Sequence, residues 1–214
     1  MKTGADQLYD AIIQGNHETS RRITREALDG GADPQQLVND FMIPAMAEVG
    51  RRFDRSEFFV PELLLAARAV KATMELLKPL LAERGAEPIG RVIVGSVKGD
   101  LHDIGKNLVA AMLEGGGFEV FDLGVNVAPE AFVNAAREKD ARIIGMSALL
   151  TTTLASMKKT VDAFRAAGSR DQVRILVGGA PVTQRFADEI GADGYSVNAP
   201  GAVELAKRVL QASP

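Results

Sequence analysis

One histidine of this chain lies in a loop with two carboxylates, a combination that can hold a metal. His102 has Asp100 two residues before it and Asp103 beside it. An aspartate that accepts a hydrogen bond from one imidazole nitrogen fixes the tautomer, and it leaves the other nitrogen free as a metal ligand of raised basicity. The alternative is a solvated loop histidine without a function. The position of His102 in the fold distinguishes these two interpretations.

Two further segments are suited to ligand binding. Ser147 and the threonines from Thr151 to Thr153 offer hydrogen bonds without charge. Gly178 and Gly179 allow a ligand to come against bare backbone. Together the hydroxyls and the glycines predict a deep, neutral slot.

A nucleotide is not the ligand that these loops favour. Gly99 and Gly105-Lys106 resemble a phosphate-binding loop, but five residues separate the glycines where four are required, and Asn107 stands where Ser or Thr should hold magnesium. No G-x-G-x-x-G segment supports a dinucleotide site. A phosphorelay receiver domain would need an aspartate at the end of the third strand, where Ser147 stands.

The second part of the chain alternates short β-branched runs with helical patterns. Nearly unbroken apolar strands in regular alternation with helices predict a parallel sheet covered on both faces, and we expect a five-stranded flavodoxin-like (Rossmann-like) α/β domain. The expected strands are Arg91–Val97, Phe118–Leu123, Arg142–Ser147, Val173–Val177 and, more weakly, Tyr195–Val197, with helices near 104–114, 130–139, 154–167, 182–190 and 200–211.

The three unusual segments all follow strands of this expected sheet. The histidine loop comes after the first strand, the hydroxyl segment after the third, and Gly178-Gly179 after the fourth. Ligands of open parallel sheets bind outside the carboxyl ends of the strands, near the switch point between the first and third strands. This position favours a functional role for His102 over a solvated one.

The first part of the chain is expected to be a small helical bundle, because its apolar residues recur at helical spacing. Asn16 is a candidate cap for the second helix, Asp33 with Pro34 and Gln36 predicts a capped start of the third, and Pro44 predicts a boundary or kink. The breaker-rich segment 85–90 separates the parts. We therefore expect a helical domain at residues 1–88 and the α/β domain at residues 89–214.

Composition excludes several other classes of protein. Twenty-five Lys and Arg against 28 Asp and Glu, scattered along the chain, give no footprint for nucleic acid or an anionic membrane. No apolar run approaches the roughly 18 residues that span a bilayer, so a cytoplasmic protein without a membrane partner is expected. The lack of cysteine removes disulfides, thiolate metal sites and cysteine nucleophiles.

Taken together, the three loops resemble the signature of cobalamin-binding domains. Asp100-x-His102-x-x-Gly105, Ser147-x-Leu149 and Gly178-Gly179 stand in the order and in the loops where that family has them. The segment from Val49 to Glu62 resembles the helical cap of cobalamin-dependent methionine synthase and of small corrinoid methyl-carrier proteins. Mutases of the same superfamily use a different domain there, so the cap points to methyl transfer.

The resemblance implies a cobalamin, as methylcobalamin or a related corrinoid, that is held base-off with histidine as the lower cobalt ligand. His102 would bind cobalt, Asp100 would bond to His102, and Thr153 would complete this relay where methionine synthase has a serine. Phe53 and Val60 would cover the methyl group, and the family has a leucine in place of Val60. Both residues also suit the core of the bundle. The cofactor contacts implied are Leu101, Asp103, Ile104 and Gly105 in the histidine loop, Ser147, Leu149, Thr151, Gly178 and Gly179 along the slot for the nucleotide tail, and Ala199 near the nucleotide base.

By the same resemblance the chain is a carrier more than an enzyme. A substrate-specific methyltransferase would load the cobalt, a second methyltransferase would deliver the methyl group to coenzyme M or tetrahydrofolate, and a reductive activase would rescue oxidised cobalt. The Asp100–His102 pair would take up a proton when the lower ligand leaves, and the 85–90 linker would let the cap move aside. A cobalamin-dependent sensor remains the alternative, and a methionine synthase fragment would need substrate modules that are absent here.

Overall fold

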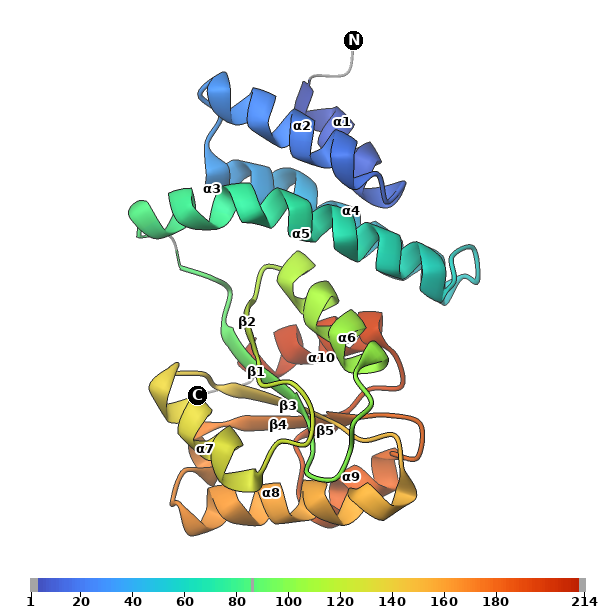
Figure 1. Cartoon of the computed structure of the whole chain (residues 1–214), viewed down its shortest axis with the longest axis vertical. Coiled ribbons are helices and arrows are strands. Elements are labelled where there is room, and N and C mark those ends of the chain that lie inside the picture. Colours follow the sequence, from blue (N-terminus) through green and yellow to red (C-terminus); the bar gives the residue numbers. More distant parts are fainter. Residues whose placement is uncertain (1–3, 86, 212–214) are drawn as a thin grey trace. The chain divides into compact units, whose positions relative to one another are not determined.

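The computed structural model describes residues 4–85 and 87–211, which form two compact units. One unit contains the residues up to Ile89 together with Ala111–Gly117. The other contains Gly90–Ala110 and the residues from Phe118 onward. Figure 1 shows the first unit as helices only and the second as a sheet with helices.

The second unit is built on a five-stranded parallel sheet with the strand order β2-β1-β3-β4-β5. In register, Ser96 of β1 pairs with Ser147 of β3, and Ser147 pairs with Gly178 of β4. The flavodoxin-like fold expected from the sequence is confirmed, and the carboxyl ends of the three central strands are level with one another. The strands are β1 (Arg91–Ser96), β2 (Glu119–Asp122), β3 (Ile143–Ser147), β4 (Arg174–Gly178) and β5 (Gly194–Tyr195).

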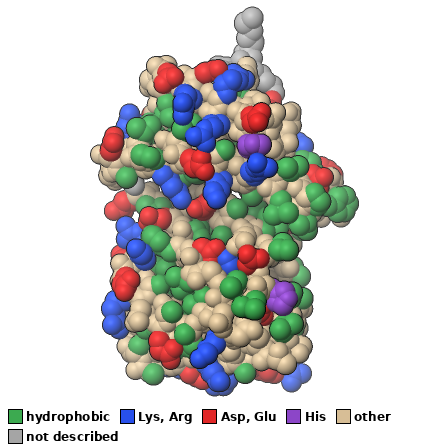
Figure 2. Space-filling model, viewed as in Figure 1, with side chains coloured by type: hydrophobic (Ala, Val, Ile, Leu, Met, Phe, Trp, Pro, Cys, Tyr) green, Lys and Arg blue, Asp and Glu red, His purple; other side chains and the backbone are tan. Residues whose placement is uncertain are grey.

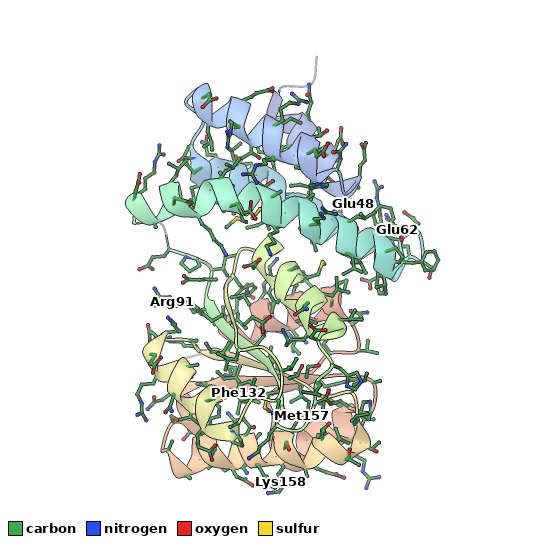
Figure 3. All side chains as sticks on the ribbon, viewed as in Figure 1. Glu48, Glu62, Arg91, Phe132, Met157 and Lys158 are labelled. Carbon is green, nitrogen blue, oxygen red and sulfur yellow. The ribbon has the colours of Figure 1, made fainter. Side chains whose placement is uncertain are left out.

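Helices cover both faces of this sheet, as Figure 1 shows: α7, α8 and α9 lie on one side and α6 and α10 on the other. Phe132 of α7 and Met157 of α8, both labelled in Figure 3, are fully buried in one apolar cluster with Ile144 of β3. Each such side chain contributes roughly 1.5–3 kcal/mol through its removal from water. The elements are α6 (Ile104–Gly115), α7 (Pro129–Glu138), η2 (Thr151–Thr153), α8 (Leu154–Ala166), η3 (Arg170–Gln172), α9 (Gln184–Ile190) and α10 (Ala199–Gln211).

Most expected boundaries in this unit agree with the structure to within one residue, and two are wrong by two residues. Helix α9 begins at Gln184 and not near 182, because the Thr183 side chain caps it by accepting a hydrogen bond from the Phe186 N–H at 3.1 Å. Strand β5 ends at Tyr195, before Val197, whose side chain is 79% exposed. An edge strand has one neighbour, so little packing extends it.

The first unit consists of amphipathic helices around an apolar core, as the helical spacing predicted. Leu8 and Ile12 of α1, Ile23 of α2 and Leu63 and Leu77 of α5 are all buried. The Asn16 side chain caps α2 by accepting the Thr19 N–H at 3.0 Å, as expected. The helices are α1 (Gly4–Ile13), α2 (His17–Asp29), α3 (Pro34–Gln36), η1 (Leu37–Met42), α4 (Ile43–Asp54) and α5 (Val60–Glu83).

The expected start of the third helix is correct, but its cap is not. Asp33 makes no side-chain capping bond, because its carboxylate pairs with Arg84 at 2.6 Å. Pro44 falls in the first turn of α4, and the chain runs into it through the π-helical η1 without a break. A wider π turn accommodates a proline, which lacks the N–H of the α-helical ladder and clashes with the preceding turn.

Candidate functional site

The structure brings the predicted residues of the second unit to one edge of the sheet. Asp100 and His102 lie in the loop between β1 and α6, Ser147 ends β3, and Gly178 ends β4. Leu149 and Thr151 follow β3, Gly179 follows β4, and the buried Ala199 begins α10 after β5. Because all five strands are parallel, these loops share the carboxyl edge of the sheet.

Asp100 and His102 form a hydrogen-bonded pair. His102 Nδ1 lies 2.8 Å from Asp100 Oδ1, and the His102 N–H donates to the same oxygen at 3.1 Å. An ionised carboxylate can only accept, so Nδ1 carries the proton of this hydrogen bond and Nε2 is the nitrogen left outside it. The Asp100 side chain is fully buried whereas 49% of the His102 side chain is exposed, so the imidazole is anchored at one end and open at the other.

The second oxygen of Asp100 is held from the far side of the switch point. Oδ2 accepts from the Leu149 N–H at 2.7 Å, the Leu150 N–H at 3.3 Å and the Thr153 hydroxyl at 2.8 Å. Thr153 also has its hydroxyl 2.8 Å from the Leu150 carbonyl, and its single proton serves one of these acceptors at a time. The carboxylate thus ties the loop after β1 to the loop after β3.

The environment of Asp100 keeps this carboxylate ionised. Burial raises its pKa, but the hydrogen bonds from the Leu149 N–H, the Thr153 hydroxyl and His102 lower the pKa by more. The net result is a pKa well below the ordinary range of an aspartate. A permanently negative acceptor therefore stands behind the imidazole.

The glycine pair at the end of β4 packs against the end of β3. Gly179 has a φ of +127°, and a Cβ there would lie 1.9 Å from the Ala148 carbonyl oxygen. A Cβ at Gly178 would meet the Ser196 carbonyl oxygen at 3.2 Å. Only glycine leaves this part of the carboxyl edge free of side chains, which fits the expected slot.

Large apolar side chains around the histidine loop face solvent. Leu101 and Ile104 are 70% and 71% exposed, and Leu149 and Leu150 are 44% and 43% exposed. Figure 2 shows hydrophobic side chains reaching the surface of both units. Apolar clusters of this kind mark ligand or partner sites. One free imidazole nitrogen with an apolar surround fits a metal that arrives inside a large, flat, apolar chelate.

The helical unit carries the two predicted cap residues, Phe53 and Val60. Phe53 is half-buried near the end of α4, and Val60, at the start of α5, is 46% exposed. Glu48 of α4 pairs with Arg52 at 2.9 Å, and Arg52 lies over the Phe58 ring, 5.3 Å from its centroid. Figure 3 labels Glu48 and also Glu62, which accepts the Phe59 N–H at 2.9 Å. The connection between the two helices is therefore well anchored, and the role of Phe53 and Val60 as a cap stays a prediction.

Sequence reasoning missed several contributors to the site. The Ser96 hydroxyl donates to the His102 carbonyl and Leu150 adds an N–H to Asp100. A serine within the otherwise apolar run of β1 was a signal for the first, but nothing local identifies the second. The Asp103 carboxylate accepts from the Asn107 amide at 3.1 Å, whereas the carboxylate bonded to the His102 ring is that of Asp100.

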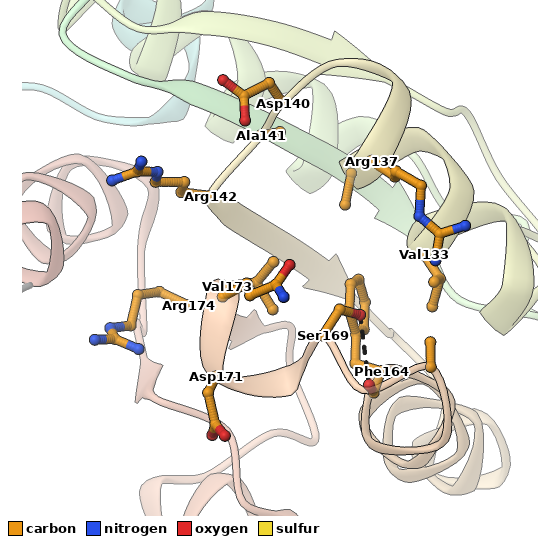
Figure 4. A pocket seen from close by; sticks show the side chains of 13 residues that line it. Val133, Arg137, Asp140, Ala141, Arg142, Phe164, Ser169, Asp171, Val173 and Arg174 are labelled. Atoms are coloured by element: carbon orange, nitrogen blue, oxygen red, sulfur yellow. Dashed lines mark hydrogen bonds between the residues drawn. The ribbon is translucent and has the colours of Figure 1, made fainter.

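A cavity of about 630 Å³ lies elsewhere in the second unit (Figure 4). It opens between α7 and α8 near the amino ends of β3 and β4, with Arg142 and Arg174 at one side, Arg137 at the other and Phe164 and Val173 among its apolar lining. None of the predicted site residues lines this cavity. The chemistry of the histidine loop therefore belongs to the opposite edge of the sheet.

Comparison with known proteins gives consistent matches along the chain. Residues 90–204 match one family described as a B12 binding domain, and residues 5–78 match a second family of the same description. A corrinoid protein of Desulfitobacterium hafniense is 39% identical over 96% of each chain, and trimethylamine corrinoid protein 1 of Methanosarcina acetivorans is 42% identical over 94% of each.

Solved structures agree with these matches. A cobalamin-binding protein from Desulfitobacterium hafniense aligns with a TM-score of 0.77 and 34% identity, covering 95% of this chain and 97% of that one. The methanol:cobalamin methyltransferase complex of Methanosarcina barkeri contains a chain that aligns with a TM-score of 0.85 and 28% identity, over 98% of this chain and 80% of that one.

In the part of the chain that the structure describes, no helix combines the length and the apolar composition that a membrane span requires.

Proposed function

This chain belongs to the family of cobalamin-binding corrinoid proteins, and from that premise we propose that it carries a methyl group on a corrinoid held base-off with His102 as the lower ligand. Cobalamin is its cofactor, and corrinoid proteins of methyltransferase systems are its relatives. When bound, the corrinoid supplies a cobalt that accepts and releases the methyl group. The residues of this chain hold, orient and shield it.

The observation that carries the proposal is the pair between Asp100 and His102. Asp100 holds Nδ1 at 2.8 Å and leaves Nε2, on a half-exposed ring, as the nitrogen available to cobalt. The ionised carboxylate increases the electron density on the imidazole and also stabilises its protonated form. We therefore expect the Asp100–His102 pair to take up a proton when the imidazole leaves the metal.

The slot supports the base-off mode. Ser147 and Gly178 end two adjacent strands and Gly179 follows directly, so no side chain of the glycines fills the space outside these strands. We assign this space to the displaced nucleotide tail, with Leu149 and Thr151 beside it and Ala199 near the base. Leu101, Ile104 and Gly105, with Asp103, would then lie along the lower face of the ring, and Phe53 and Val60 over its upper face.

The partners follow from the relatives. Names such as trimethylamine, dimethylamine and methanol in these relatives support a substrate-specific methyltransferase as the first partner. A second methyltransferase acting on coenzyme M or tetrahydrofolate, a reductive activase, and a cytoplasmic location remain predictions. The chain then serves as a mobile methyl carrier whose chemistry the partners complete.

Reconstitution tests the proposal. Purified protein is loaded with hydroxocobalamin, and the absorption spectrum is compared for the unmodified chain, His102→Ala and His17→Ala. His17, the chain's other histidine, begins α2 in the helical unit and makes a matched control. We expect the base-off, histidine-ligated spectrum to be lost in H102A and kept in H17A. A spectrum that H102A leaves unchanged would exclude His102 as the ligand.

A further inference from the structure

The loop that carries His102 is held at its first residues by the segment that follows β2. The Gly99 N–H donates to Asn126 Oδ1 at 2.8 Å. The Asn126 N–H donates in turn to the Asp100 carbonyl at 2.8 Å. One residue thus makes two hydrogen bonds to the peptide groups that lead into the histidine loop.

The same segment holds the other end of the loop. Lys106, in the first turn of α6, is 4% exposed, and its ammonium pairs with the Asp122 carboxylate and donates to Asn107 Oδ1. The other oxygen of Asp122 accepts the Gly124 N–H at 2.8 Å. A buried ammonium is costly unless it is paired, so this contact is a strong constraint on where α6 begins.

The segment from Asp122 to Val127 is itself fixed to the sheet. The Ser96 N–H donates to the Gly124 carbonyl at 3.0 Å, and the Val127 N–H donates to the Ser96 carbonyl at 2.9 Å. Asn126 adopts a φ of +53°, a left-handed conformation that asparagine tolerates better than most residues. Asn126 therefore stands on a rigid base, with its side chain turned back to Gly99.

We propose that Asn126 is a positioning residue for His102: with Asp122 it fixes both ends of the histidine loop and presents the imidazole already ordered to the cofactor. This inference rests on the proposed role of His102 as the lower ligand. Asn126 does not touch the imidazole, and acts through the backbone of Gly99 and Asp100. A loop that is ordered before binding loses less conformational entropy when the ligand arrives.

The test uses three substitutions. Asn126→Gly keeps the left-handed backbone accessible and removes the side-chain acceptor, whereas Asn126→Asp keeps an acceptor oxygen at the same position. Asp140→Gly is the matched control, because Asp140 is also exposed, has a φ of +48° and lies in the turn between α7 and β3. Thermal unfolding of the cofactor-free proteins checks that all three fold.

The variants are compared by two measurements, NMR of the cofactor-free protein and binding of hydroxocobalamin. In the cofactor-free protein, proton–nitrogen NMR of the two histidine rings reports whether His102 keeps one ordered arrangement, with a proton on Nδ1 in the hydrogen bond to Asp100. We expect that state in the unmodified chain, N126D and D140G, and an averaged or broadened His102 signal in N126G, with His17 unchanged. We also expect N126G alone to bind hydroxocobalamin about three- to tenfold more weakly, which is the value of one such hydrogen bond.

The outcomes separate the two levels of the account. The positioning role is overturned if N126G matches D140G in both readouts, or if N126D loses as much as N126G. If the unmodified, loaded protein shows no histidine ligation at all, the proposed function is wrong. The NMR comparison would still decide whether Asn126 orders the loop.

Discussion

Replacing Asp100 by asparagine should weaken both the fold and the grip on the cofactor. The most favourable arrangement keeps the asparagine carbonyl oxygen at the Oδ2 position, where the Leu149 and Leu150 N–H groups and the Thr153 hydroxyl still find an acceptor. The amide nitrogen then faces His102 and donates, so the imidazole has to accept at Nδ1 and carry its proton on Nε2. That tautomer cannot bind a metal through Nε2.

The magnitude follows from the hydrogen bonds. Hydrogen bonds to a charged group contribute about 1.5–3 kcal/mol and neutral ones about 0.5–1.5 kcal/mol, so the three bonds at Oδ2, each losing roughly 1 kcal/mol, reduce the free energy of unfolding by about 3 kcal/mol. The His102 N–H, which loses its acceptor at Oδ1, adds to this loss. Loss of the correct tautomer should reduce cobalamin affinity by about 10- to 100-fold, the usual effect of removing a partner of a metal-bound histidine.

The stability effect has a defined pH dependence. Because the pKa of Asp100 is lower in the folded chain than in the unfolded one, its stabilisation is complete above about pH 4, the ordinary aspartate range, and is lost as the pH falls toward the folded pKa. The contribution of the Asp100 carboxylate, measured as the difference in unfolding free energy between the unmodified chain and D100N, should therefore shrink as the pH falls below about 4.

The assay is urea unfolding of the cofactor-free proteins, followed by circular dichroism, together with cobalamin titration at pH 7. Asp103→Asn is the matched control, because Asp103 is exposed and bonds only to Asn107 in the described contacts of its side chain. We expect D103N to stay within about 0.5 kcal/mol of the unmodified chain. If D100N is as stable as D103N and binds cobalamin as tightly as the unmodified chain does, the role assigned to the carboxylate is wrong.

Substitutions at four further positions should change the stability of the chain or its binding of cobalamin. Gly179→Ala places a Cβ 1.9 Å from the Ala148 carbonyl oxygen and should cost several kcal/mol of unfolding free energy, measured by urea unfolding. The Cβ of Gly105→Ala would meet no atom within 4 Å, so the free energy of unfolding should stay unchanged. Cobalamin binding in titrations should weaken, because the alanine side chain would occupy space where the corrin ring is proposed to lie. Thr153→Val should lose about 1–2 kcal/mol through one hydrogen bond to the buried carboxylate, and Thr153→Ser should retain it; equal stabilities would refute this. Asn16→Ala should cost about 1 kcal/mol through the lost cap of α2, and an unchanged urea midpoint would contradict it.

Local patterns predicted most of the fold. Compact β-branched runs identified the strands, and their regular alternation with helices predicted the parallel flavodoxin-like sheet that the structure has. The errors arose where a distant residue decided a local feature. The Asp33 side chain was expected to cap α3, but Arg84, 51 residues away, takes its carboxylate.

In the site, too, local contacts could be predicted from the sequence and long-range contacts could not. The pairing of Asp100 with His102 is local, so spacing and chemistry could predict it. The bonds from Leu149 and Leu150 join residues 49 and 50 positions apart, and depend on the register of β1 with β3. Asn126 carried no sequence signal of its own, because its contact with Gly99 exists only once β2 is placed beside β1.

Electron paramagnetic resonance of the loaded protein in its Co(II) state tests the central claim most directly. A single axial nitrogen splits the cobalt lines, and growth with ¹⁵N-labelled histidine changes the splitting only if that nitrogen belongs to a histidine of this chain. We expect the triplet of ¹⁴N to become the doublet of ¹⁵N in the labelled protein and in labelled H17A, and to vanish in H102A. Identical spectra for labelled and unlabelled protein would contradict ligation by His102.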